Sequence, residues 1–190
     1  AYQPKLPKGL TGTVKAVAGA ATQSVADQEE IKKLFPNTYG MPLIKFENTD
    51  ETVDFPAMNV GVILSGGQAP GGHNVISGIF DGIKKLNKDS KLYGFILGPG
   101  GLVDHNYMEL TADIIDEYRN TGGFDIIGSG RTKLEKEEQF EKGLEILKEL
   151  NIKALVIIGG DDSNTNACVL AEYYACLLYT SPSPRDYAAS

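Results

Sequence analysis

The chain has 190 residues, of which 42% are hydrophobic and 23% are charged. This composition is typical of a folded globular body and excludes disorder, collagen or a coiled coil as a description of the whole chain. A formal net charge of -7 disfavours a general nucleic-acid binder, and no apolar run approaches the ~20 residues that cross a bilayer. We therefore expect no nucleic-acid or membrane partner and, with only two cysteines, a cytoplasmic location.

Residues 1–56 carry a mixed pattern of polar and apolar residues. We expect them to form an N-terminal extension packed on the sheet described next, rather than a separate domain. Within this extension the sequence predicts a short helix over residues 27–34, which ends before Pro36, and a strand over residues 42–46.

From residue 57 to residue 175, short aliphatic runs alternate with segments of helical period. The runs are followed by glycines and are predicted to be strands buried on both faces of a parallel sheet: 59–64, 92–97, 124–127 and 154–158. The predicted helices are 75–86, 108–118, 135–150 and 165–174. This repeated order predicts the α/β class with a doubly wound, mostly parallel sheet. Ligands of such sheets bind beyond the carboxyl ends of the strands.

The glycine-rich segment 65–72 lies between a predicted strand and an amphipathic helix. Its glycines allow the backbone to approach an anion closely, and the free N–H groups that open the helix would point at that anion. The segment is neither a dinucleotide fingerprint nor a P-loop, because His73 and Asn74 follow where lysine and serine or threonine are required. The alternative interpretation is a tight turn that merely needs glycine.

A second junction, residues 159–166, places Asp161 and Asp162 directly after a glycine pair. A carboxylate at the end of a strand, beside a phosphate cradle, is well placed to hold Mg²⁺ on the phosphates. Helix capping by Asp162 or Ser163 is the alternative, but capping does not account for two adjacent carboxylates. Two such turns in one sheet favour phosphate binding.

Other residues of chemical interest carry a weaker signal. Arg131 and Lys133 follow a third glycine turn, where they could neutralise phosphates or be solvated surface charges. His73 and His105 lack metal-ligand spacing and are predicted to be structural or solvent-facing. Cys168 is predicted to lie in the core.

In this order and at this separation, the segments 61–72 and 158–166 resemble the phosphofructokinases, and within them the pyrophosphate-dependent type. The resemblance covers residues 57–175 and implies an incomplete phosphofructokinase-like donor-binding lobe. It implies phosphoryl transfer from pyrophosphate to the 1-hydroxyl of fructose 6-phosphate, which gives fructose 1,6-bisphosphate in a reversible step of glycolysis. It also implies a homo- or hetero-oligomer for the full-length protein.

The resemblance further implies roles for single residues. Asp161 would bind Mg²⁺, and Asp162 would decide donor specificity, because its bulk and charge exclude the α-phosphate of ATP while pyrophosphate still fits. The residues implied to contact the donor are Gly66, Gly67, Arg131, Lys133, Gly160, Asp162 and Ser163.

The sequence departs from the family after residue 175. The family carries its catalytic base in a Thr-Ile-Asp type motif after a further strand, and no such segment is present here. Residues 176–190 are instead rich in Ser and Pro, and we predict a disordered or artefactual tail that looks like translated vector or adapter sequence. We therefore expect the chain as written to be inactive by itself. The alternatives are a non-catalytic regulatory phosphofructokinase-like subunit and an ATP-dependent phosphofructokinase.

Overall fold

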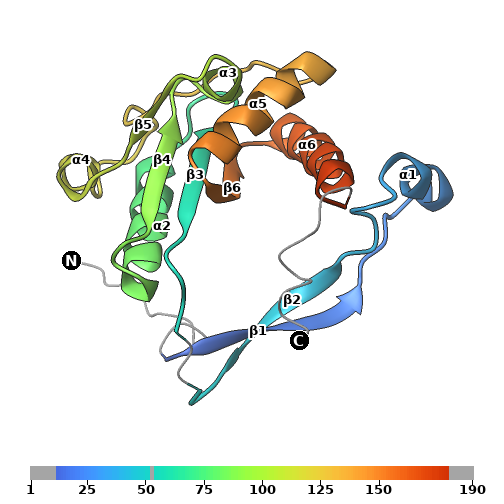
Figure 1. The fold of residues 1–190 in the computed structure, drawn as a ribbon, viewed down its shortest axis with the longest axis horizontal. Helices are drawn as coiled ribbons and strands as arrows, with labels where there is room; N and C mark the ends of the chain where they lie inside the picture. The colour runs from blue at the N-terminus through green and yellow to red at the C-terminus, as the bar shows by residue number, and fades with distance from the viewer. Residues whose placement is uncertain (1–11, 52–53, 180–190) are drawn as a thin grey trace. The chain divides into compact units, whose positions relative to one another are not determined.

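The computed structural model describes residues 12–51 and 54–179, and the chain divides into two compact units, Ala1–Asp54 and Phe55–Ser190. In the first unit (Figure 1), β1 (Val14–Ala21) pairs antiparallel with β2 (Pro42–Asn48), and α1 (Gln28–Leu34) lies between them in sequence. The helix predicted over residues 27–34 is α1 and the strand predicted over residues 42–46 is β2, so both predictions are confirmed. The sequence analysis missed β1, because its run of alanine, glycine and valine carries little of the β-branched and aromatic signal of a strand.

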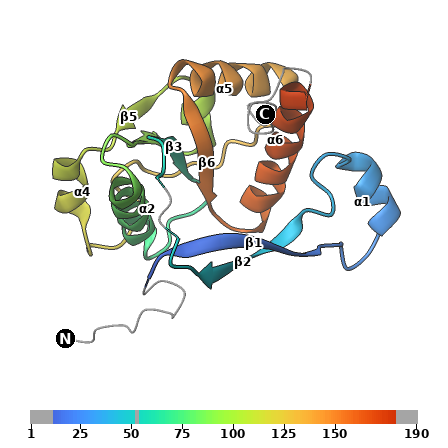
Figure 2. The ribbon, with the colours of Figure 1, turned by 60° about the horizontal axis from the view of Figure 1, so that its bottom comes forward.

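The second unit is built on a four-stranded sheet with the order β5-β4-β3-β6 (Figure 1 and Figure 2). Strands β3 (Asn59–Leu64), β4 (Lys91–Phe95) and β6 (Ile152–Ile158) are parallel, and β5 (Tyr107–Glu109) is antiparallel to β4. The predicted α/β class with a mostly parallel sheet is confirmed.

Helices cover both faces of this sheet. They are α2 (Gly72–Leu86), α3 (Pro99–Val103), α4 (Ala112–Tyr118), α5 (Glu137–Glu149) and α6 (Asp161–Tyr179). Val60, Val62 and Leu64 of β3 belong to the buried cluster that contains residues of α2 and α4. Ile63, between them, belongs to the cluster that contains residues of α3, α5 and α6. Successive side chains of β3 thus pack against helices on opposite faces, and the sheet is doubly wound because helices cover both faces.

The connections of β3 define where a ligand is expected to bind. The chain leaves β3 through α2 and enters β4 on one side, whereas β6, much later in the sequence, pairs with β3 on the other side. Leu64 at the end of β3 is in register with Ile158 at the end of β6. The carboxyl ends of β3 and β6 therefore form a topological switch point, the place where open α/β sheets bind ligands.

One predicted element is wrong, and another is confirmed as helix α4 over Ala112–Tyr118 but wrong at its start. Residues 124–127 form a turn instead of a strand, in which the Gly128 N–H donates to the Phe124 carbonyl at 2.7 Å, although Phe124 and Ile127 are buried. The start of the helix predicted over 108–118 is strand β5, because Glu109 pairs with Tyr93 of β4. Both segments are apolar because they help to form the core, and short buried segments of this kind do not reveal their backbone conformation by periodicity.

The prediction for Cys168 is also wrong, since this side chain is exposed. The buried Ser163 and Leu170 are seven residues apart on α6 and share a face, whereas Cys168 lies about 140° around the helix from Ser163. Helix α6 continues to Tyr179, and residues 180–190 of the predicted tail lie outside the described residues. Within the described part of the chain, no helix has the length and hydropathy needed to span a membrane.

Candidate functional site

A cavity of about 1020 Å³ lies at the carboxyl ends of β3 and β6. Most of its wall comes from the turn after β3, the turn after β6 and the segment 131–133. Every residue that the sequence analysis assigned to the site lines this cavity: Gly66, Gly67, Arg131, Lys133, Gly160, Asp161, Asp162 and Ser163. The fold thus brings together residues from three segments that are separated by up to about a hundred positions in the sequence.

The turns after β3 and β6 are joined directly to each other. The Ser65 N–H donates to the Ile158 carbonyl at 2.7 Å, and the buried Ser163 hydroxyl donates to Ser65 Oγ at 2.8 Å. A Cβ added at Gly159 would lie 2.5 Å from Ser163 Cβ and 2.7 Å from the Ser65 carbonyl oxygen. Glycine is therefore required at residue 159, and the Ser163 hydroxyl is engaged in holding the two turns together.

The segment that carries the cations is attached to the turn after β3. Ser65 forms a parallel bridge with Gly130, and the Gly66 N–H donates to the Gly130 carbonyl at 2.8 Å. A Cβ added at Gly67 would lie 3.1 Å from Arg131 Nη2, so the guanidinium lies against this glycine. Because the Gly66 amide is engaged in this bridge, we expect contacts of the backbone with an anion to come from later amides of the turn.

The charges on the cavity wall have opposite signs. Arg131 and Lys133 supply two cations, and Asp161 and Asp162 supply two exposed carboxylates at the first turn of α6. Within residues 12–51 and 54–179, none of these four side chains forms a salt bridge. The wall can therefore present cations to a phosphate and carboxylates to a metal at the same time.

The start of α2 adds a further feature that favours an anion. This helix begins at Gly72, its first turn contains no acidic residue, and Gly71 before it has a φ of 98°, a conformation that favours glycine. The first N–H groups of an α-helix lack intrahelical partners and carry partial positive charge. Gly71 and Gly72 both line the cavity, so this positive helix end lies at its wall.

The carboxylate pair matches the ligand requirement of Mg²⁺ better than that of a metal held only by protein. Among the described residues there is no group of three or more His, Cys, Asp or Glu side chains that could hold a metal. Mg²⁺ usually takes one or two carboxylates and completes its shell with water and substrate phosphates. Asp161 and Asp162 fit that pattern.

Asn166 holds the segment with Arg131 and Lys133 onto helix α6. Its Oδ1 accepts from the Leu134 N–H at 3.0 Å, and its Nδ2 donates to the Leu134 carbonyl at 2.5 Å. Leu134 is buried. The side chain therefore satisfies both backbone groups of a residue directly after Lys133.

We expect Asn166→Ala to lower the free energy of unfolding by about 1–3 kcal/mol, since it removes two hydrogen bonds to the backbone of a buried residue. Asn164→Ala is the matched control: its Nδ2 bonds to the Gly160 carbonyl, which already accepts the Asn164 N–H. The control should change stability by less than about 0.5 kcal/mol. Urea unfolding followed by circular dichroism measures both, and equal effects would contradict this role of Asn166.

The sequence analysis missed one part of the wall. Phe124 lines the cavity, and its ring occupies the space that a Cβ on Gly72 would need. That Cβ would also lie 2.7 Å from the Gly123 carbonyl oxygen. The sequence signal was the glycine at residue 72, but nothing in the sequence shows that an aromatic ring about fifty residues later fills that space.

The structure therefore defines an α/β lobe with glycine turns, cations and carboxylates at a switch point, an arrangement typical of proteins that bind phosphorylated ligands. Residues 59–181 match the family described as Phosphofructokinase. The chain belongs to the phosphofructokinase family.

Individual relatives agree with this assignment. The chain is 69% identical over 176 residues to a pyrophosphate–fructose 6-phosphate 1-phosphotransferase of Porphyromonas gingivalis, in an alignment that covers 93% of this chain and 32% of the relative. It is 50% identical over 170 residues to the subunit beta 1 of the same enzyme from Arabidopsis thaliana, covering 89% and 30% of the two chains. The phosphofructokinase structure from Saccharomyces cerevisiae matches with a TM-score of 0.57 and 26% identity, covering 65% of this chain and 16% of that chain. The chain spans about a third of the length of these curated relatives.

Proposed function

We propose that the chain is the donor-binding part of a pyrophosphate-dependent 6-phosphofructokinase. The reaction transfers a phosphoryl group from pyrophosphate to the 1-hydroxyl of fructose 6-phosphate and gives fructose 1,6-bisphosphate and phosphate, reversibly, as a step of glycolysis. The observation that carries this proposal is the cavity at the switch point, lined by two cations from one segment and the carboxylate pair from another. The printed names of the relatives at 69% and 50% identity support the donor and the acceptor.

Each part of the wall has a distinct task in this proposal. The turn after β3 and the positive end of α2 bind the donor phosphates through backbone amides. Arg131 and Lys133 neutralise the phosphate oxygens and orient the donor for in-line attack by the sugar hydroxyl. Asp161 holds Mg²⁺, which would stabilise the negative charge of the phosphates during transfer. We assign only the donor half of the reaction to this chain.

Asp162 decides which donor is accepted. Its carboxylate lies on the cavity wall next to Asp161 and is exposed. A nucleotide must place a third phosphate and a nucleoside where pyrophosphate has nothing, so an extra carboxylate repels and obstructs ATP more than it does pyrophosphate. The ATP-dependent alternative predicts no such discrimination.

The experiment is a comparison of donor binding by isothermal titration calorimetry on the 190-residue chain in the presence of Mg²⁺. We expect the wild-type chain to bind pyrophosphate in preference to ATP, and Asp162→Gly to shift this preference towards ATP by about tenfold or more, because one charge repulsion is removed. The matched control Asp161→Asn should weaken the binding of both donors. An unchanged preference in Asp162→Gly would contradict our account of Asp162, and a wild-type chain that binds no pyrophosphate would contradict the proposed function.

For the full-length protein we propose a cytoplasmic enzyme that assembles into an oligomer. The printed name of the Arabidopsis relative, which is a subunit, supports an assembly of more than one chain. The same name leaves one second candidate open, a non-catalytic regulatory subunit. A gene that continues into a Thr-Ile-Asp type motif favours the enzyme, and neutral residues in place of that aspartate favour the regulatory subunit.

A further inference from the structure

His73 lies on the first turn of α2 and is not part of the cavity wall, yet both nitrogens of its ring are engaged. The side chain is 1% exposed. Nδ1 lies 2.8 Å from Thr121 Oγ1, and Nε2 accepts from the Ile126 N–H at 3.1 Å. Thr121 Oγ1 itself donates to the Tyr118 carbonyl at 2.7 Å. These partners fit one form of the ring, the neutral imidazole with its proton on Nδ1.

The ring connects both ends of the turn 121–127. The backbone adds a third link, because the His73 N–H donates to the Gly123 carbonyl at 3.0 Å. The middle of this turn is Phe124, whose ring packs over Gly72 and lines the cavity. His73 therefore holds in place the aromatic part of the cavity wall.

The same turn also leads into the segment that carries the cations. The Ile127 carbonyl accepts from the Leu97 N–H at 2.8 Å, and three residues later Gly130 bonds to Gly66. Arg131 follows immediately. A displacement of the turn would therefore move Phe124 directly and would strain the backbone between Ile127 and Gly130, which leads to Arg131.

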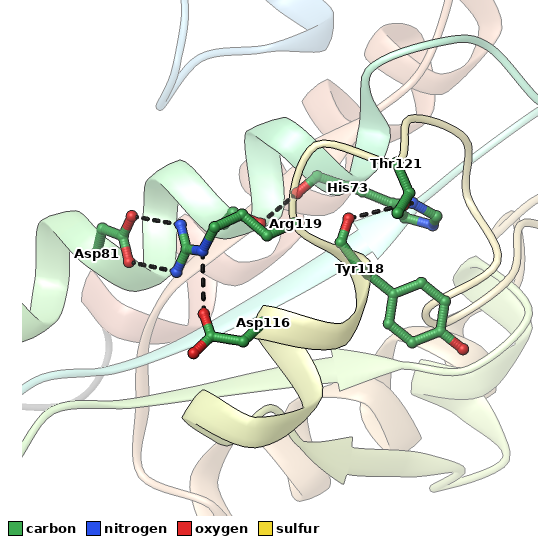
Figure 3. Close-up of polar contacts among 7 residues, drawn as sticks. His73, Asp81, Asp116, Tyr118, Arg119 and Thr121 are labelled. Atoms are coloured by element: carbon green, nitrogen blue, oxygen red, sulfur yellow. Dashed lines mark hydrogen bonds and ion pairs between the residues drawn. The ribbon is translucent and has the colours of Figure 1, made fainter.

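The charged groups around the ring are few and largely engaged. From α4, the Tyr118 ring meets the imidazole edge-on with centroids 5.0 Å apart. Arg119, next in the chain, binds Asp81 of α2 at 2.8 Å and 3.1 Å and Asp116 of α4 at 3.0 Å (Figure 3). Asp125, on the turn itself, is the carboxylate that favours the charged imidazole. Burial outweighs it and lowers the pKa of His73 from its ordinary value of 6.5.

We propose that neutral His73 is a positioning residue for the donor site, and that protonation of Nε2 releases the turn 121–127 and weakens the binding of pyrophosphate. The choice of pyrophosphate as the ligand rests on the proposed function, whereas the release of the turn does not. A protonated Nε2 can no longer accept from the Ile126 N–H, so one buried amide loses its partner. Because the pKa is lowered, the neutral form holds the turn above pH 6.5, and its effect is lost as the pH falls through the lowered pKa.

The test compares the wild-type chain with His73→Gln, whose amide oxygen can accept from Ile126 and does not titrate. Pyrophosphate binding is measured by calorimetry from about pH 8 to about pH 5. The titration of pyrophosphate itself is common to both proteins and cancels in the ratio of their affinities. We expect the affinity of the wild type divided by that of His73→Gln to fall by about fivefold or more on acidification. His105→Gln changes the other histidine, whose ring is near the Lys142 carbonyl, and should keep the wild-type profile.

A second measurement reads the turn without any ligand. We expect ¹⁵N NMR of the ring to show the neutral form with the proton on Nδ1, and acidification to shift the amide signals of Ile126 and Arg131 in the wild type but not in His73→Gln. A proton on Nε2, or an identical pH response in the two proteins, would overturn the proposal. Absence of pyrophosphate binding at every pH would instead overturn the proposed function, and the amide signals would still decide the role of His73.

Discussion

Arg131→Ala is expected to weaken the binding of pyrophosphate with Mg²⁺ by about 10- to 100-fold, because hydrogen bonds to a charged group contribute about 1.5–3 kcal/mol each. The guanidinium lies against Gly67 on the cavity wall, and the backbone before it is fixed by the bridge from Gly130 to Ser65. The backbone that carries the cation is thus positioned before the ligand arrives, so mainly side-chain entropy is lost when the guanidinium binds a phosphate.

Two further substitutions separate the effect of the charge of Arg131 on affinity from the effect of its geometry. Arg131→Lys keeps the charge but loses the planar fork that binds two phosphate oxygens at once, so we expect an intermediate loss of affinity. Lys148→Ala, near the end of α5 and outside the cavity wall, is the control for a general change in charge. Calorimetry at two salt concentrations measures all three variants. Equal affinities for Arg131→Ala and Lys148→Ala would remove Arg131 from the donor site.

The main elements could be predicted because their signals are local. A short aliphatic run, a glycine turn and a helical period lie within about thirty residues, which is the length of one βαβ unit. The strands β3 and β6 and the helices α2 and α5 were found in this way. The turn 124–127 was not, since its apolar residues are buried against β3, β4 and α2 without forming a strand of the sheet.

The residues of the candidate site could be predicted from the sequence, but the contacts that hold them together could not. The carboxyl ends of parallel strands meet at one edge, so the two glycine junctions were expected to be near each other. The contacts that hold them are long-range: Ser163 bonds to Ser65 across 98 positions, and His73 bonds to Thr121 and Ile126 across 48 and 53. No periodicity or motif reports such pairs, which is why Ser163 was predicted to contact the ligand and His73 had no assigned partner.

A substitution in the glycine pair after β6 is expected to have the second large effect, a loss of stability. We expect Gly159→Ala to lower the free energy of unfolding by about 1–3 kcal/mol, the usual result of adding a methyl group to a filled site. The new Cβ would meet the Cβ of Ser163 at 2.5 Å and the Ser65 carbonyl at 2.7 Å, so the ends of β3 and β6 must separate. Because the cavity lies at these ends, the same variant should also weaken pyrophosphate binding.

Gly160→Ala is the adjacent control, since a Cβ there meets no atom within 4 Å and the residue has no positive φ. Alanine is a poorer residue than glycine before a helix but restricts the unfolded chain, so we expect stability within about 1 kcal/mol of the wild type. The double variant Gly159→Ala/Ser163→Gly tests the cause. It removes the clash with the Ser163 side chain but also the hydrogen bond from Ser163 to Ser65, so the double variant should lose less stability than the sum of the losses of Gly159→Ala and Ser163→Gly. Urea unfolding that showed equal stability for the two alanine variants would mean that the β3 and β6 turns are not packed as tightly as the distances at Gly159 require.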